Sequence, residues 1–213
     1  MDADGLVQDV LALVAGAGRR VLLGVAGAPG AGKSTLARFL VREVERRLGD
    51  GVAAYVPMDG FHLSNAQLAR LGLTDRKGSE PSFDVRGYVA LLGRLRSADP
   101  YPVYVPDYDR ELDEPVAARH VVPPSARLVV TEGNYLAASR PGWPQARELL
   151  DAVWYLDTPD PVRERRLLER QRAGGRDEAA ARAWVRGNDM PNGELVKATR
   201  DGCTRVVTVR SEP

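Results

Sequence analysis

Apolar runs and amphipathic patterns alternate along the 213-residue chain. Five short runs are rich in Val, Leu and Ala without polar alternation, which is typical of strands buried on both faces of a parallel sheet. These predicted strands are residues 21–26, 52–57, 128–131, 152–156 and 205–209. The pattern therefore favours an open sheet with covered faces.

Helical patterns fall between these runs. They span residues 33–48, 84–97, 145–150, 159–172 and 177–190, and an N-terminal helix would carry Leu6, Val7, Val10, Leu11 and Val14 on one face. Strands that alternate with helices predict an α/β fold with helices on both faces of a parallel sheet. Ligands bind such sheets beyond the carboxyl ends of the strands.

The first predicted strand runs into GAPGAGKST, residues 27–35. The spacing Gly-x-x-x-x-Gly-Lys-Ser is the P-loop signature, in which backbone N–H groups surround phosphates, Lys33 reaches the outer ones and Ser34 ligates Mg²⁺. The alternative is a glycine-rich turn without a ligand. We predict an ATP and Mg²⁺ site built from Gly27, Ala28, Pro29, Gly30, Ala31, Gly32, Lys33, Ser34 and Thr35.

Carboxylates follow the second and third predicted strands. Phosphoryl transfer needs held phosphates, a metal ion, and a carboxylate that orients the acceptor hydroxyl and takes its proton. We predict Asp59 as this base and Glu132 as a metal-side ligand, although each could be a turn or cap residue. His62 and Asn134 lie just beyond the same strand ends and are predicted to contact the acceptor.

Two segments interrupt the alternation of strands and helices. Residues 60–83 and 98–125 are rich in Pro, Gly and charge, and both are too long for simple connectors. We interpret them as flaps that bind the acceptor, with tolerated surface insertions as the alternative.

Arginines crowd the segment after the fourth predicted strand. Thr158 and Pro159 have the form of an N-cap and a first helical residue. Arg163, Arg166 and Arg170 share one face of the expected helix, whereas Arg172 and Arg176 flank the diglycine at 174–175. Most such runs are solvated faces. We predict a lid at about residues 166–180 whose Arg166, Arg172 and Arg176 contact the phosphates, Arg166 with a catalytic role beside Lys33 and Asp59.

Charge and composition narrow the partners. The chain has 30 Lys and Arg against 29 Asp and Glu, so its net charge of +1 gives no general attraction to nucleic acid or to a membrane surface. One cysteine, Cys203, fits a reducing compartment. No apolar run is long enough for a membrane span or an export signal. We expect a cytoplasmic protein with a small-molecule acceptor, and a homodimer stays open.

The assembled motifs resemble a known family. GAPGAGKST, MDGFH, RKGSEPSFD, VYVPDYD, VVTEGNYL and RRLLERQRAGGRD look like the P-loop kinases of the uridine kinase, phosphoribulokinase and bacterial pantothenate kinase superfamily, in the nucleoside/nucleotide kinase-like or fructose-transport-type branch. The likeness spans about residues 20–209. It implies a single domain over residues 1–213, the P-loop NTPase fold in three α/β/α layers with five parallel strands, and an arginine-bearing lid.

The resemblance also implies roles for individual residues. Asp59 matches the catalytic aspartate, Arg166 and Arg176 match lid arginines, and Asp84 matches a carboxylate that holds ribose hydroxyls. The further residues expected near the acceptor are Phe83, Tyr108, Arg76 and Lys77, the last two resembling pantothenate kinases. Asp84, Arg76 and Lys77 could instead be solvated loop charges, and Tyr108 could pack on its flap.

The sequence thus predicts an ATP- and Mg²⁺-dependent kinase that phosphorylates a hydroxyl of a small polar metabolite, with a nucleoside or a sugar as the favoured acceptor. Pantothenate is disfavoured because residues 160–200 contain only one aromatic residue, Trp184. A pantothenate kinase-like enzyme and a nucleotide-dependent switch without a metabolite acceptor remain as alternatives.

Overall fold

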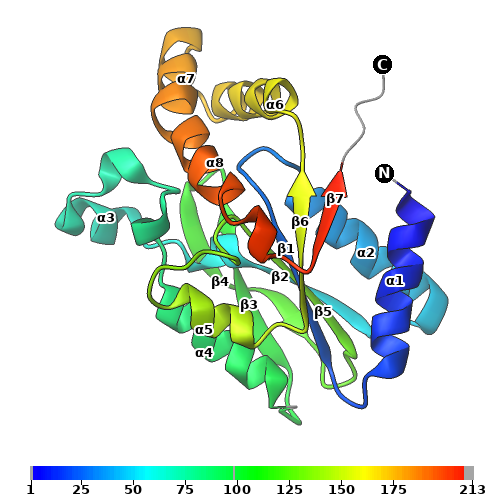
Figure 1. The fold of residues 1–213 in the computed structure, drawn as a ribbon. Helices are drawn as coiled ribbons and strands as arrows, with labels where there is room; N and C mark the ends of the chain where they lie inside the picture. The colour runs from blue at the N-terminus through cyan, green and yellow to red at the C-terminus, as the bar shows by residue number, and fades with distance from the viewer. Residues whose placement is uncertain (1, 98, 209–213) are drawn as a thin grey trace.

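A five-stranded parallel sheet forms the centre of the computed structural model, which describes residues 2–97 and 99–208 (Figure 1). Its strands lie in the order β2-β5-β1-β6-β7 and are all parallel. Their bounds are β1 Val21–Ala26, β2 Ala53–Pro57, β5 Leu128–Gly133, β6 Ala152–Asp157 and β7 Arg205–Thr208. The sheet confirms the predicted fold class; residues 98 and 209, which began one predicted flap and ended one predicted strand, lie outside the described residues.

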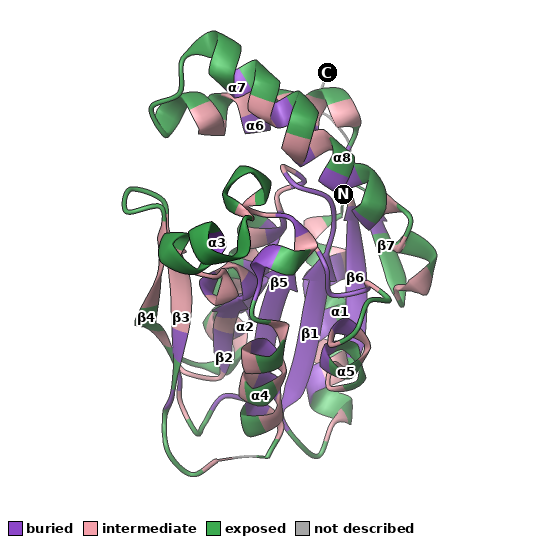
Figure 2. Ribbon diagram, turned by 90° about the vertical axis from the view of Figure 1, so that its left-hand side faces the viewer, coloured by how far each residue is buried: buried purple, intermediate pink, exposed green. Residues whose placement is uncertain are grey.

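Helices cover both faces of this sheet, as continuous apolar strands require. Leu23 on β1 packs with α1 (Ala3–Gly16) and α2 (Lys33–Leu48), whereas its neighbour Leu22 packs with α4 (Val85–Arg96) and α5 (Trp143–Glu148). Figure 2 shows the strands as a buried layer between more exposed helices. Within the described residues, no helix is both long and apolar enough to cross a membrane.

Three further helices stand beyond the carboxyl ends of the strands: α6 (Asp160–Ala173), α7 (Glu178–Trp184) and α8 (Met190–Lys197) (Figures 1 and 2). The sequence pattern predicted one helix over 177–190. The structure instead inserts a π-helical turn, Val185–Asp189, between α7 and α8. Such turns place side chains outside the regular helical spacing, and periodicity alone therefore missed it.

The two predicted flaps have secondary structure of their own. The first carries the short helix α3 (Asn65–Leu71) and two single turns, Thr74–Arg76 and Glu80–Ser82. The second folds as a hairpin of β3 (Val103–Asp109) and β4 (Glu114–Val122), which the sequence pattern did not predict. Two prolines and a bulge break the apolar alternation of this hairpin, and they conceal its strands from a periodicity analysis.

Arg20 fixes the base of the hairpin. Its guanidinium is buried at 8% exposure and donates to four backbone carbonyl oxygens. Nη1 donates to Leu95 at 3.0 Å, just before the hairpin segment, while Nε and Nη2 donate to the residues that follow the hairpin: Ala126 at 2.8 Å, Pro124 at 3.2 Å and Pro123 at 3.3 Å. One side chain therefore holds both ends of this segment together.

Candidate functional site

The loop after β1 has the backbone conformation that its glycines permit. Gly30 has φ 77°, and a Cβ there would lie 2.9 Å from the carbonyl oxygen of Arg163. Gly32 has φ 98° and is the residue before the first turn of α2. Only glycine adopts such angles without strain. The loop therefore curls over the N-terminus of α2, whose free N–H groups attract anions.

Lys33 is the buried cation of this loop, with 8% of its surface exposed. Its Nζ donates to Asn134 Oδ1 at 2.6 Å and to the Ala28 carbonyl oxygen at 3.3 Å. Burial lowers the pKa of Lys33. Asn134, which was predicted to contact the acceptor, here accepts a hydrogen bond from Lys33. The acceptor contact of Asn134 and the phosphate contact of Lys33 stay predictions.

Glu132 lies at the end of β5, and one of its carboxylate oxygens accepts hydrogen bonds from two hydroxyl groups. Ser34 Oγ donates to its Oε1 at 2.9 Å, and the Tyr55 hydroxyl donates to the same atom at 2.8 Å. Burial raises the pKa of Glu132, and the nearby charge of Asp59 raises it further. The sequence analysis missed Tyr55, whose position on a sheet strand carries no sequence signal for this contact.

A hydroxyl beside a carboxylate suits Mg²⁺, which prefers oxygen ligands and keeps several waters or phosphate oxygens. Among the described residues, no group of three or more His, Cys, Asp and Glu side chains could hold a metal ion. Ser34 and Glu132, whose side-chain oxygens lie 2.9 Å apart, are the residues that fit Mg²⁺ by the chemistry of their oxygens.

The start of α6 is tied to the P-loop. Arg163 is almost fully buried and its Nε donates to the Pro29 carbonyl oxygen at 2.9 Å. Arg166 Nη1 and the Thr158 hydroxyl both donate to the Ala31 carbonyl oxygen, at 3.2 and 3.0 Å. The expectation that Thr158 caps α6 is wrong: its hydroxyl binds the loop instead, and α6 begins at Asp160 after Pro159.

The remaining arginines of the predicted lid region divide into two groups. Arg172 pairs with Glu178 at 3.4 Å, and Arg176 lies 4.3 Å from the centre of the Trp184 ring, so both contact α7. Arg170 instead pairs with Asp189 at 3.7 Å. Its charge adds to the effect of burial in lowering the pKa of Lys33. Burial lowers the pKa of Arg170 itself, and the charges of Asp189 and Asp59 oppose that shift.

Arg170 is therefore a residue that the sequence analysis left out of the site. The signal was present, because Arg170 follows Arg166 by four residues on the same helical face. The phosphate-binding roles predicted for Arg166, Arg172 and Arg176 stay predictions.

The acceptor side begins directly after β2. Asp59 lies in a short turn, Met58–Phe61, and its Oδ2 is 3.5 Å from Nη2 of Arg110 on the hairpin. The His62 ring lies between Phe83, at 4.0 Å between ring centres, and Tyr108, at 4.8 Å. Burial lowers the pKa of His62, whose Nδ1 lies 2.8 Å from the Asp59 carbonyl oxygen. The structure thus brings four predicted residues together and adds Arg110.

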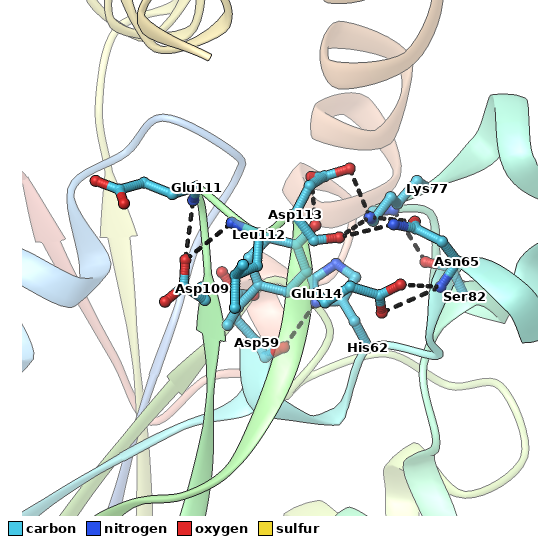
Figure 3. A network of polar contacts seen from close by, with 12 residues as sticks. Asp59, His62, Asn65, Lys77, Ser82, Asp109, Glu111, Leu112, Asp113 and Glu114 are labelled. Atoms are coloured by element: carbon cyan, nitrogen blue, oxygen red, sulfur yellow. Dashed lines mark hydrogen bonds and ion pairs between the residues drawn. The ribbon is translucent and has the colours of Figure 1, made fainter.

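Figure 3 shows how the hairpin tip meets the first flap. Lys77 Nζ donates to Asp113 Oδ2 at 2.8 Å and to Asn65 Oδ1 at 2.6 Å. The Glu114 carboxylate accepts from the backbone N–H of Asn65 at 3.0 Å. These bonds, which we call the flap clasp, join Asn65 and Lys77 to Asp113 and Glu114.

Two predicted acceptor residues lie at the margin of this arrangement. Arg76 is exposed in a single turn of the first flap. Asp84 is exposed and caps α4, accepting from the Gly87 N–H at 2.9 Å. The cap leaves one carboxylate oxygen of Asp84 for another partner, so its assignment to acceptor hydroxyls stays a prediction.

A pocket of about 440 Å³ adjoins the P-loop on the side of α2. Apolar side chains supply much of its wall. Its lining residues are Ala3, Ala31, Gly32, Thr35, Leu36, Phe39, Arg42, Leu156 and Arg166. A planar, largely apolar group could bind there beside the loop.

Comparisons with known proteins agree with this geometry. No family model matches the chain. It is 34% identical over 181 residues to a uridine kinase-like protein of Schizosaccharomyces pombe, covering 82% of this chain and 77% of that protein. The crystal structure of a Silicibacter sp. TM1040 protein that is named, without an established activity, as a fructose transport system kinase matches with a TM-score of 0.87 and 35% identity, over 97% of this chain and 99% of that one.

Pantothenate kinases match a smaller part of the chain and only about half of their own length. The enzyme of Limosilactobacillus reuteri is 30% identical over 154 residues, which cover 70% of this chain and 48% of that protein. The chain therefore spans about half the length of that relative.

Proposed function

The chain belongs to the P-loop kinases related to uridine kinases and bacterial pantothenate kinases, and from this membership we propose that it transfers the γ-phosphoryl group of ATP to a hydroxyl of a nucleoside or a sugar. One observation carries the proposal: the P-loop follows β1, Asp59 follows β2, and Glu132 lies at the end of β5, the strand between them. Adjacent parallel strands bring a phosphate cradle, a metal-side carboxylate and a base to one edge.

The nucleotide would occupy the P-loop side of this edge. The loop amides and Lys33 bind the phosphates, and Arg166 and Arg170 supply further positive charge from α6. The pocket beside Thr35 and Phe39 suits a nucleobase, because it is concave and largely apolar. Ser34 and Glu132 would hold Mg²⁺, which when bound offsets the charge that develops on the phosphates.

The acceptor would lie between Asp59 and the aromatic rings of His62, Phe83 and Tyr108. In the transfer step, the acceptor hydroxyl gives its proton to the Asp59 carboxylate and its oxygen forms a new bond to the γ-phosphorus. The bond between that phosphorus and the bridging oxygen of ADP breaks, and ADP leaves. Asp59 is half-buried, with 29% of its side chain exposed, and can reach both solvent and acceptor.

ADP release tests this proposal directly. The protein, ATP and Mg²⁺ are incubated with nucleosides, ketoses, polyols and pantothenate, and acceptor-dependent ADP is measured for wild type and Asp59→Asn. A nucleoside or sugar should stimulate release, and Asp59→Asn should lower that rate by about 10²–10⁴-fold with nucleotide affinity nearly unchanged. Turnover by Asp59→Asn within a few-fold of wild type would contradict the assigned base; pantothenate as the one good acceptor would replace the proposed acceptor class.

A further inference from the structure

Arg110 is the cation closest to the proposed base, and it is held only loosely. Its Nη2 is 3.5 Å from Asp59 Oδ2, with 56% of the Arg110 side chain and 29% of the Asp59 side chain exposed. Within residues 2–97 and 99–208, the Asp59 carboxylate forms no hydrogen bond. An ion pair between partly exposed groups is weak and easily exchanged for another partner.

The other cation beside the same ring is already committed. Lys77 lies 5.2 Å from the centre of the Tyr108 ring, but its three N–H donors bind Asn65 and Asp113. Arg110 lies 6.0 Å from that ring centre and carries five N–H donors in a planar fork. Of these two cations, Arg110 has donors left for a ligand.

The hairpin tip that carries Arg110 is fixed in place. The flap clasp holds Asp113 and Glu114, and the Asp109 carboxylate accepts from the backbone N–H groups of Glu111 and Leu112 at 3.0 Å, as Figure 3 shows. A long, partly exposed side chain on a fixed backbone can exchange partners without moving the loop. Arg110 can therefore turn from Asp59 toward a bound molecule.

We propose that Arg110 binds an anionic group of the acceptor, a phosphate or a carboxylate, and thereby leaves Asp59 to the acceptor hydroxyl. The acceptor class is then a hydroxylated metabolite that also carries an anion, such as a sugar phosphate, a nucleotide or a sugar acid. This inference rests on the proposed function, because it takes Asp59 as the base.

Charge and geometry give the reasons for this choice. A guanidinium matches phosphate and carboxylate in a bidentate fashion, which a neutral sugar cannot offer. A neutral acceptor would leave Arg110 against Asp59, so that the acceptor hydroxyl competes with the guanidinium for the carboxylate. An anionic acceptor binds Arg110 and ends this competition, so the same contact selects the substrate and frees the base.

Neighbouring charges support this assignment. Arg110 opposes the charged form of His62 and of Arg170, and it therefore lies within the electrostatic reach of both sides of the site. Asp189 pairs with Arg170, and Asp113 accepts from Lys77. These two acids already have cationic partners, and Asp59 is the acid paired with Arg110.

Paired acceptors test the inference. Rates of ADP release are compared for ribose and ribose 5-phosphate, fructose and fructose 6-phosphate, uridine and uridine monophosphate, and glycerol and glycerate. Wild type, Arg110→Gln and Arg119→Gln are measured. Arg119 is a matched control because it lies on the same hairpin, pairs with Asp109 at 3.1 Å and is 49% exposed.

We expect the anionic member of at least one pair to have the higher kcat/KM. Arg110→Gln should lower that value by about 10- to 100-fold and change the neutral partner by less than about threefold, as expected for a lost charge-assisted hydrogen bond. Arg119→Gln should leave both within about twofold. Arg110→Lys should restore part of the loss, because it returns the charge without the fork.

The inference is overturned if the neutral members are preferred, or if Arg110→Gln lowers both members equally; the kinase assignment survives either result. ADP release that no compound stimulates contradicts the proposed function and this inference with it. A response to phosphates alone or to carboxylates alone supports the inference and identifies which anion is bound.

Discussion

The nucleotide side and the acceptor side of the site are built differently. Lys33 and Glu132 are buried at 8% and 3% exposure, and the loop between β1 and α2 is held by hydrogen bonds that its backbone carbonyl oxygens accept from Lys33 and Arg163. On the acceptor side, Asp59 and Arg110 are partly exposed, and the flap clasp joins side chains at the surface. One side is preformed by the sheet, whereas the other depends on two inserted segments touching one another.

This difference separates a shared function from a specific one. A triphosphate is the same in every kinase, so a rigid cradle set by backbone geometry serves it well. Acceptors differ, and exposed side chains on insertions can be exchanged with little effect on the core. Substitutions on the two sides should therefore fail in different ways.

The largest effect should follow from removing the cradle's cation. Lys33→Ala should lower kcat/KM by about 10³–10⁵-fold for every acceptor, because its charge acts on the phosphates. Lys77→Ala is the counterpart on the acceptor side: loosening the flap clasp should raise the KM of the acceptor by about tenfold and leave that of ATP unchanged. ADP release is measured for both variants at matched thermal stability. If both lose kcat/KM equally and for every acceptor, the two sides of the site do not differ in function.

A smaller effect should separate two arginines of α6. Arg170→Gln should lower kcat by about 10²-fold, because its charge acts on Lys33 and on Asp59 at the site. Arg172→Gln should stay within about twofold, since Arg172 pairs with Glu178 of α7. Steady-state kinetics measure kcat for both variants. A larger loss of kcat for Arg172→Gln than for Arg170→Gln would support the phosphate contact of Arg172 that the sequence predicted.

Tyr55→Phe tests whether the Tyr55 hydroxyl supports Glu132 on the nucleotide side of the site. The variant loses one hydroxyl bond to Glu132 and keeps the one from Ser34, so we expect about a three- to tenfold weaker apparent Mg²⁺ affinity. Titration of Mg²⁺ at fixed ATP measures this change, with thermal unfolding as a second measurement. An unchanged Mg²⁺ dependence would limit Tyr55 to packing.

The smallest effect concerns the pH dependence of stability at His62. Burial lowers its pKa from the ordinary value of 6.5, so the ring is neutral in the folded and the unfolded chain well above that pH. As pH falls through 6.5 toward the lowered folded value, the unfolded chain binds the proton first and the free energy of unfolding decreases. Urea unfolding at pH 8 and pH 5 should show a larger decrease for wild type than for His62→Gln; equal decreases would contradict a buried, neutral ring.

The same contrast explains how much the sequence could predict. The P-loop is contiguous in the sequence, and the positions of Lys33 and Ser34 follow from local geometry. The motif was therefore sufficient to predict where these two residues lie. Strand-end acids such as Glu132 follow from the parallel sheet. The hairpin, the ion pair of Arg110 with Asp59, and the ion pair of Arg170 with Asp189 depend on contacts between segments that are distant in the sequence. No local pattern encodes those contacts.

Arg20 has a further consequence for how such a fold can change. By donating to the carbonyl oxygens of Leu95 and Pro123, it holds together the two ends of the segment that carries the hairpin. Once a loop's ends are pinned, doubling its length adds only about 0.6 kcal/mol of closure entropy. Residues can therefore be inserted or deleted at the hairpin tip while β2, β5 and β1 keep their register. The same sheet can then carry hairpins of different length, each suited to an acceptor of a different size.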